Sequence, residues 1–170
     1  MKRTQAMVLL ISLMACAPAQ GQVTKDRSER GAGEAEVIRN GSRPAVTNPP
    51  EHSTGNVRVD ASFRRAAPAR VAGGMVSFEP GARTAWHSHP LGQTLIVTSG
   101  VGWTQCGNGL IVEMRPGDIV WCPPGVRHWH GASPTTGMTH IAIYEMLDGK
   151  AVDWAEKVSD AEYLRGPKGR

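Results

Sequence analysis

Three histidines and one glutamine of this 170-residue chain are of the types, and at the spacings, that could hold one metal ion. His87 and His89 are two residues apart, so on an extended strand both side chains point to the same face. Gln93 follows after a turn through Pro90-Leu91-Gly92, and His128 comes from a second stretch. Three imidazoles and one amide oxygen suit a first-row divalent ion with open coordination positions. The sequence therefore predicts a metal site formed by these four side chains.

Two further histidines extend this group. His130 lies two residues beyond His128, so strand alternation turns it to the same face. In the segment Met138–Glu145, alternation puts His140 and Tyr144 together on one face. If that face lines the interior, His140 and His130 can act as acid/base groups near the metal, with Tyr144 as a hydrogen-bonding group. The alternative for His140 is a buried histidine that bonds to the backbone.

Short β-prone segments separated by Gly and Pro must position these side chains, and they begin at Gly55. Arg115-Pro116-Gly117 is one of the turn signals, and Gly107-Asn108-Gly109 is typical of a hairpin tip. Many short strands with regular turns indicate an antiparallel sandwich or barrel, followed by a short helix within Asp153–Leu164 that carries Trp154. The expected strands are Val57–Phe63, Val71–Phe78, Thr94–Ser99, Gly102–Cys106, Ile111–Met114, Asp118–Cys122 and Met138–Glu145.

The two histidine stretches also match a pair of family motifs. The first reads Gly81-(x5)-His87-x-His89-(x3)-Gln93-(x6)-Gly100, and the second reads Gly117-(x5)-Pro123-x-Gly125-x2-His128. With these motifs the chain resembles a small single-domain cupin. That resemblance implies an all-β, jelly-roll-like barrel (a single double-stranded β-helix) over residues 55–165, which pairs into a homodimer.

A longer resemblance covers roughly residues 55–163. Phrases such as His89-Pro90-Leu91-Gly92-Gln93-Thr94-Leu95-Ile96 and Leu147-Asp148-Gly149-Lys150-Ala151-Val152-Asp153-Trp154 are similar to the bacterial manganese-dependent cupin hydroxynitrile lyases. The resemblance implies Mn²⁺ at His87, His89, Gln93 and His128, with Fe²⁺ or another first-row metal as the alternative. It also implies a substrate pocket that includes Val76, Thr84, His130 and His140.

Two positions bear on the chemistry that these resemblances imply. Most metal-binding cupins have glutamate where this chain has Gln93, and a neutral ligand leaves the full charge on the ion, which makes it a stronger Lewis acid. Where the lyases carry a glutamine, this chain has Tyr144, a larger side chain that can still donate a hydrogen bond. The presence of Tyr144 in place of the lyases' glutamine bears on the substrate and not on the metal.

The function expected from the resemblance is a lyase that cleaves or forms cyanohydrins such as mandelonitrile. In that reaction the metal supplies Lewis acidity and orientation, while His140 takes the hydroxyl proton with the help of His130. Two other functions compete with it: a metal-dependent cupin oxygenase, and a non-catalytic cupin that binds a small ligand at the cell envelope. Oxygen uptake by the iron form would favour the oxygenase, and ligand-induced stabilisation without turnover would favour the binding protein.

The N-terminal residues predict export. A basic start and an apolar run from Ala6 to Ala15, too short to span a bilayer comfortably, indicate a removable signal within residues 1–21. Leu13-Met14-Ala15-Cys16 resembles a lipobox that would lipidate Cys16, whereas Ala17-Pro18-Ala19 offers an ordinary cleavage site. Both alternatives predict a periplasmic protein, and the first also predicts a membrane-anchored lipoprotein.

Composition describes the remaining segments. Residues 22–54 are rich in Gly, Ser, Asn and Pro and read as a flexible, disordered tether, and residues 166–170 read as a tail. From residue 55 onward there are twelve basic and ten acidic side chains and no basic run with interleaved aromatics, which gives nucleic-acid binding no support. Cys106 and Cys122 are expected to be separate thiols, although an exported compartment also permits a disulfide.

Overall fold

Short antiparallel strands dominate the structure, a computed structural model that describes residues 35–168. The unit that begins at Ile38 contains all of the elements named below. In chain order these are β1 (Val46–Thr47), β2 (Ser53–Thr54), β3 (Val57–Arg64), β4 (Val71–Phe78), β5 (Arg83–Thr84), β6 (His87–Ser88), β7 (Gln93–Gly100), β8 (Gly102–Cys106), β9 (Val112–Met114), β10 (Ile119–Cys122), β11 (His128–Ala132), β12 (Met138–Glu145), β13 (Asp153–Trp154) and α1 (Asp160–Tyr163).

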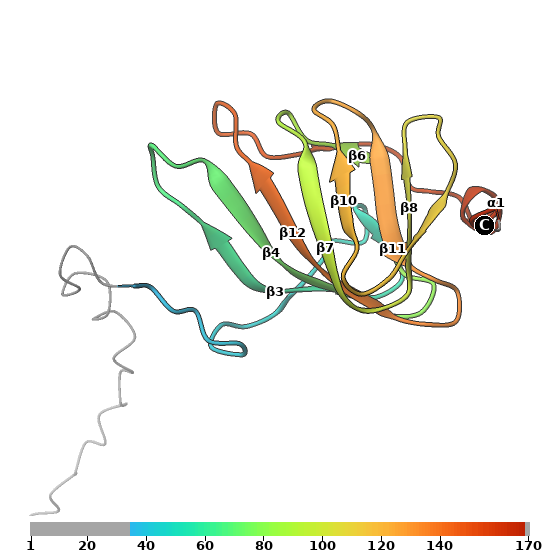
Figure 1. Ribbon diagram of the computed structural model, residues 1–170, viewed down its shortest axis with the longest axis horizontal. Coiled ribbons are helices and arrows are strands. Elements are labelled where there is room, and N and C mark those ends of the chain that lie inside the picture. The colour runs from blue at the N-terminus through green and yellow to red at the C-terminus, as the bar shows by residue number, and fades with distance from the viewer. Residues whose placement is uncertain (1–34, 169–170) are drawn as a thin grey trace, which may run out of the picture. The chain divides into compact units, whose positions relative to one another are not determined.

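The strands form two antiparallel sheets (Figure 1). One sheet has the strand order β1-β3-β4-β12-β7-β10. The other runs β13-β6-β11-β5-β2, with β8 paired to both β11 and β9. β11 pairs with β5, β6 and β8, although β7 and β10 of the other sheet lie between these strands in the sequence. The chain therefore crosses repeatedly from one sheet to the other. This architecture confirms the predicted jelly-roll-like barrel, and all seven strands expected from the sequence are present.

Strand alternation decides which side chains of β12 face the interior. Met138, His140 and Ala142 are buried, whereas the intervening residues are more exposed. β4 lies beside β12 in register, with His140 opposite Val76 and Ala142 opposite Gly74. The strands approach each other so closely that a Cβ at Gly73 would lie 2.2 Å from the carbonyl oxygen of Ala142. Glycine is therefore required at Gly73 for this approach.

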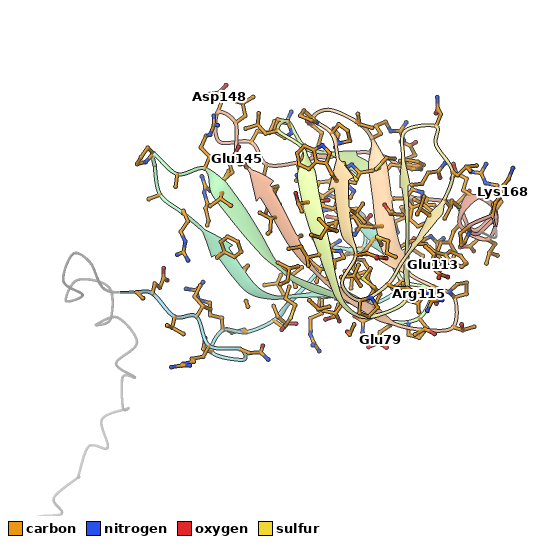
Figure 2. The ribbon with its side chains drawn as sticks, viewed as in Figure 1. Glu79, Glu113, Arg115, Glu145, Asp148 and Lys168 are labelled. Carbon is orange, nitrogen blue, oxygen red and sulfur yellow. The ribbon has the colours of Figure 1, made fainter. Side chains whose placement is uncertain are left out.

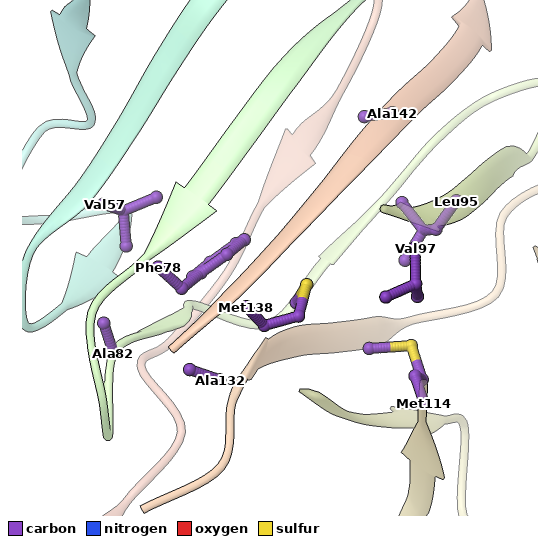
Figure 3. Packing of buried hydrophobic residues seen from close by; sticks show 9 residues of the cluster. All are labelled: Val57, Phe78, Ala82, Leu95, Val97, Met114, Ala132, Met138 and Ala142. Carbon is purple, nitrogen blue, oxygen red and sulfur yellow. The ribbon is translucent and has the colours of Figure 1, made fainter. Parts of the chain in front are cut away.

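A hydrophobic core lies between the sheets (Figure 3). Leu95 and Val97 of β7 and Met138 of β12 come from the first sheet, and Ala132 of β11 and Met114 of β9 come from the second. All five side chains are almost completely buried. Burial of this apolar surface on both inner faces holds the sheets together. The full cluster is Val57, Phe78, Ala82, Leu95, Val97, Met114, Ala132, Met138 and Ala142.

A second apolar group, here called the tryptophan cluster, lies on the opposite face of β11. Trp129 alternates with His128 and His130, so its ring points away from the barrel interior. The C-terminal segment covers this face, and the Tyr163 hydroxyl donates a hydrogen bond to the carbonyl oxygen of Ala132 at 2.7 Å. The cluster comprises Trp86, Ile111, Trp129, Val158 and Tyr163, with Trp103 packed against it.

Arg83 fastens the C-terminal segment to this face. Its buried guanidinium donates to the carbonyl oxygen of Val158 and forms an ion pair with Asp160 at the start of α1. The same group lies 4.5 Å from the centre of the Tyr163 ring, a cation–π contact. One buried side chain of β5 therefore orders the segment that covers the tryptophan cluster.

Two expected boundaries are corrected by the structure. β1 pairs with β3 and β2 pairs with β5, so ordered structure begins before Gly55, within the stretch expected to be a tether. The C-terminal helix is confined to α1, because Asp153 and Trp154 instead pair with β6. A capping box formed by Ser159 and Glu162 begins this short helix.

The predicted signal at residues 1–21, including Cys16, lies outside the described residues. No helix within residues 35–168 has the length and hydrophobicity needed to cross a membrane. Labelled charged side chains such as Glu79, Asp148 and Lys168 lie at the margins of the fold (Figure 2). Arg83, whose guanidinium is buried, is an exception among the charged residues that the structure describes.

Candidate metal centre

The barrel brings all four predicted metal ligands together from β6, β7, β11 and the turn after β6. His87 and His128 are cross-strand partners in the β6–β11 pair, and their ring centres are 4.3 Å apart. The ring centre of His89 lies 5.3 Å from that of His87 and 5.6 Å from that of His128. The Oε1 atom of Gln93 lies 3.0 Å from Nε2 of His128. All four side chains are buried.

Backbone carbonyl groups fix the orientation of the three imidazoles. Nδ1 of His87 bonds to the carbonyl oxygen of Ala85 at 3.0 Å, and Nδ1 of His128 bonds to that of Val126 at 2.9 Å. Nδ1 of His89 bonds in the same way to the carbonyl oxygen of Ala151 at 2.7 Å. A carbonyl oxygen only accepts, so each Nδ1 carries the proton and each Nε2 is left with a lone pair. This is the arrangement typical of histidines that bind a metal through Nε2.

Burial keeps these imidazoles neutral. It lowers the pKa of His89 to about 4 and the pKa of His128 below its ordinary value. It lowers the pKa of His87 well below the ordinary value, and the proximity of His128 lowers it further. Neutral imidazole is the form that binds metal ions, so the three histidines are ready to act as ligands at neutral pH.

Two atoms of the site lack the partners that their chemistry requires. Nε2 of His89 is buried without a hydrogen-bond partner. Nε2 of His128 carries a lone pair, yet it faces Oε1 of Gln93, which is also an acceptor. A buried polar atom without a partner costs about 1–3 kcal/mol. A cation between these atoms would remove that cost, so the residues present fit a divalent metal ion.

His130 also reaches this group of donors. His87, His128 and His130 each offer a ring nitrogen within 4.8 Å of the others, so these three form a potential metal-binding triad. His130 differs from the three predicted histidine ligands because its Nδ1 lies 3.0 Å from Nε2 of His140 and is not bonded to a carbonyl oxygen. Its Nε2 is therefore a lone pair or an N–H group, depending on which histidine holds the shared proton.

His140 lies behind His130 and is fully buried. Burial lowers its pKa to about 3, and the pKa of His130 is lowered well below the ordinary value by burial and by the adjacent His140. Nδ1 of His140 has no hydrogen-bond partner. The side-chain hydrogen bond of His140 is the contact of its Nε2 with Nδ1 of His130. We call these six residues, His87, His89, Gln93, His128, His130 and His140, the histidine cluster.

A cavity of about 210 Å³ opens onto the histidine cluster. Its wall includes His87, His89, Gln93 and His130, but His128 and His140 do not line it. The predicted pocket residues Val76, Thr84 and Tyr144 all do. No Asp, Glu, Lys or Arg contributes to the wall among the residues that the structure describes. Proton transfer at this site must therefore be carried out by histidine, by the phenol of Tyr144 or by a bound water molecule.

Sequence reasoning missed one wall of the cavity. Trp154 of β13 lines it and packs against His87, with ring centres 4.8 Å apart. His52, to which the sequence assigned no function, stacks on the Trp154 ring, with ring centres 4.4 Å apart. Asn48 is also on the wall. The sequence predicted a short helix in the stretch that carries Trp154, and the pairing of β13 with β6 shows where the tryptophan lies.

Known proteins share both the fold and the sequence of this chain. A model of the cupin domain matches residues 74–144. An (R)-mandelonitrile lyase of Granulicella tundricola is 59% identical over 130 residues, which are 76% of this chain and 99% of that protein. This chain belongs to the cupin family.

Solved structures agree with this assignment. A cupin-like protein from Thermotoga maritima matches this cupin with a TM-score of 0.68 and 36% identity, over 80% of this chain and 100% of that one. A predicted oxalate decarboxylase from the same organism matches with a TM-score of 0.58 and 19% identity, over 66% of this chain and 100% of that one. At that identity the second likeness shows only the fold.

Proposed function

We propose that this cupin is a manganese-dependent lyase that cleaves and forms cyanohydrins. The observation that carries the proposal is the 59% identity to an (R)-mandelonitrile lyase over 99% of that protein's length. The histidine cluster supports it, because neutral nitrogen and oxygen donors suit a first-row divalent ion. The cavity supports it as well, because its wall combines apolar side chains with imidazoles.

The proposed metal ligands are His87, His89, Gln93 and His128. A bound divalent ion supplies Lewis acidity, which favours loss of the substrate's hydroxyl proton. The apolar cavity wall excludes water from the carbonyl product, and the aromatic rings of Tyr144 and Trp154 bound the space for the substrate's side group.

His130 is proposed to exchange the proton with substrate. It lines the cavity, whereas His140, the base expected from the sequence, lies behind it. When Nε2 of His130 takes the hydroxyl proton, its Nδ1 proton can move to Nε2 of His140 across the 3.0 Å contact. The C–C bond then breaks, cyanide leaves, and the carbonyl forms. Reversal of the proton movement gives hydrogen cyanide, so His140 acts through His130 as a positioning residue.

The test is cyanide release from mandelonitrile under nitrogen, with protein loaded separately with manganese and with iron. We expect release that depends on the metal and disappears in His87→Ala together with bound metal. His52→Ala is the matched histidine control and should retain its metal, because His52 is not in the histidine cluster. Bound metal without cyanide release would contradict the lyase. Oxygen uptake by the iron form would then identify an oxygenase. Ligand binding without turnover would identify a binding protein.

We further propose that the cupin is a homodimer. Ile119, Ile96, Ile141 and Met75 are register partners in one row across β10, β7, β12 and β4. Alternation turns this row outward, away from His140 and Ala142, and Ile119 is 71% exposed. An uncharged apolar row suits burial against the same row of a second copy. Ile141→Lys should halve the mass measured by light scattering, and an unchanged mass would contradict the proposal.

Export to the periplasm is the third proposal, based on the N-terminal sequence alone. Lipidation of Cys16 would place the cupin in the membrane fraction, and Cys16→Ala would release it. Recovery of both forms in the periplasmic soluble fraction would instead support ordinary cleavage after Ala19. Recovery of the unprocessed chain in the cytoplasm would contradict export.

A further inference from the structure

Two cysteines from different sheets meet beside the histidine cluster. Cys106 is the last residue of β8, and Cys122 is the last residue of β10, the edge strand of the other sheet. Their Sγ atoms are 2.7 Å apart, although the two thiols are not joined. A disulfide requires an Sγ–Sγ distance of about 2.05 Å, so the sulfur atoms need to approach by well under an ångström.

The register connects each cysteine to a proposed metal ligand. Cys106 is directly opposite His128 in the β8–β11 pair, and Cys122 is directly opposite Gln93 in the β10–β7 pair. Residues directly opposite each other in an antiparallel pair share a face. The thiols therefore lie on the inner face, at the ends of the strands next to those that carry His128 and Gln93.

We propose that Cys106 and Cys122 form an oxidative cross-link that ties the two sheets together at the metal-binding end of the barrel. β8 and β10 are not hydrogen-bonded to each other, so a disulfide would link these two strands directly. It would restrict the separation of His128 and Gln93. The effect on His128 and Gln93, which is the second part of the proposal, rests on the proposed metal site. Formation of the cross-link, the first part, does not.

The surroundings of the thiols set the order of the reaction. Cys106 is half-buried and Cys122 is completely buried, so Cys106 is the thiol that an oxidant can reach. The hydrogen bond from the Cys122 thiol lowers the pKa of Cys106, and the same interaction raises the pKa of Cys122. The Cys106 thiolate is therefore the form that attacks.

A small-molecule disulfide such as oxidised glutathione supplies the oxidising equivalents. The Cys106 thiolate attacks one of its sulfur atoms, which breaks the glutathione S–S bond and releases one glutathione thiolate. The Cys122 thiolate then attacks Sγ of Cys106 and releases the second. Two cysteine thiols are oxidised, two glutathione thiols are formed, and they take up both protons.

A second metal site is not a competing explanation. Two thiols alone do not complete the tetrahedral coordination that thiolate-bound metals require. Among the described residues, the group of three or more potential ligands is His87, His128 and His130, which includes neither cysteine. The contact between the thiols therefore favours a bond between the sulfur atoms.

The test begins with the full chain incubated in oxidised glutathione and digested by a protease that cleaves after glutamate. Cleavage after Glu79, Glu113 and Glu145 separates the cysteines into peptides 80–113 and 114–145. We expect these peptides to remain joined until a reductant is added, in wild type and in Cys16→Ser alike. Separate peptides carrying free thiols or only glutathione adducts would overturn the cross-link, whatever the result for the metal.

Metal retention tests the second part. Oxidised and reduced protein, each loaded with Mn²⁺, are dialysed against a chelator, and metal content is measured over time. We expect at least several-fold slower loss from the oxidised form, and no effect of oxidant on Cys106→Ser/Cys122→Ser. Equal loss from the cross-linked and reduced forms would overturn the link to the metal site. Failure of every form to bind Mn²⁺ would contradict the proposed metal and the tie to it, while the joined peptides would still support the cross-link.

Discussion

His128, Trp129 and His130 are consecutive in β11, yet they belong to two regions with opposite physical chemistry. Trp129 lies in the tryptophan cluster, where its Nε1 donates to Gln105 and apolar neighbours cover its ring. His128 and His130 lie in the histidine cluster, where buried nitrogen atoms of His89 and His140 have no hydrogen-bond partner. The tryptophan cluster is built from large apolar side chains and has one such atom, Nε1 of the adjacent Trp103, whereas the histidine cluster is built from polar rings and has two.

This difference assigns separate tasks to the two faces. Burial of large apolar side chains stabilises the fold, while polar atoms without partners in the apo protein reduce its stability. The tryptophan cluster therefore offsets the cost of a site that is complete only when an ion is bound. Four predictions test this division of tasks.

At neutral pH the largest effect on stability is expected from Trp129→Ala. Truncating a fully buried tryptophan should lower the free energy of unfolding by about 3–5 kcal/mol, because it leaves a cavity in the tryptophan cluster. Denaturation by urea measures the change. Trp121→Ala is the control, since Trp121 is 55% exposed, and its loss should be much smaller. Equal losses would show that the tryptophan cluster is not the main source of stability.

Arg83→Met should have the next largest effect. It removes the buried donor to the Val158 carbonyl and the contact with the Tyr163 ring, at an expected cost of about 2–3 kcal/mol. Asp160→Asn breaks only the ion pair. Since the Asp160 side chain is 82% exposed, that loss should stay below about 1 kcal/mol. A larger loss in Asp160→Asn than in Arg83→Met would assign the stability to the ion pair instead.

The histidine cluster should make the apo protein sensitive to acid. Burial lowers the pKa of His140 to about 3, so below pH about 6.5 the unfolded chain binds a proton that the folded chain does not. Stability is therefore highest above that pH and falls as the pH decreases toward about 3, by up to about 1.4 kcal/mol per pH unit for this residue.

Urea denaturation of His140→Gln between these pH values measures its share. The variant should show a shallower dependence on pH than wild type, with a remaining slope from the other buried histidines. A wild-type slope in His140→Gln would show that His140 does not remain neutral in the folded protein.

How far the sequence predicted these regions depended on the range of the interactions involved. Spacing and alternation are local, so they placed His87 and His89 on one face, and the two rings are neighbours in the structure. Motif spacing then brought Gln93 and His128 to the same site. The seven main strands followed from turn residues and β-branched runs.

Long-range pairing was the part that the sequence did not reveal. The approach of Cys106 to Cys122 depends on two strands that are each paired to a different neighbour. Trp154 reaches the cavity only because β13 pairs with β6, and the two residues of β2 lie in a polar segment without a strand pattern. His130 lines the cavity and His140 lies behind it, and this arrangement likewise depends on the packing between β11 and β12.

The smallest effect is expected from removing one hydroxyl group in each region. Tyr144→Phe keeps the ring that stacks on His89, with ring centres 5.0 Å apart, and removes a hydroxyl that faces the cavity. One hydrogen bond contributes about 0.5–1.5 kcal/mol, so kcat/KM for mandelonitrile cleavage should fall roughly two- to tenfold. Metal content and the urea midpoint should stay at wild-type values.

Tyr163→Phe is the matched change in the tryptophan cluster. It removes the buried hydroxyl that donates to Ala132 at 2.7 Å and leaves that carbonyl oxygen with one partner fewer. The free energy of unfolding should fall by about 1 kcal/mol while kcat/KM is unchanged. The two variants are thus expected to have opposite effects, because Tyr144 lines the cavity proposed for substrate and the Tyr163 hydroxyl holds the C-terminal segment. If Tyr163→Phe lowered kcat/KM as much as Tyr144→Phe does, the two faces of β11 would be coupled, and the division between stability and chemistry would fail.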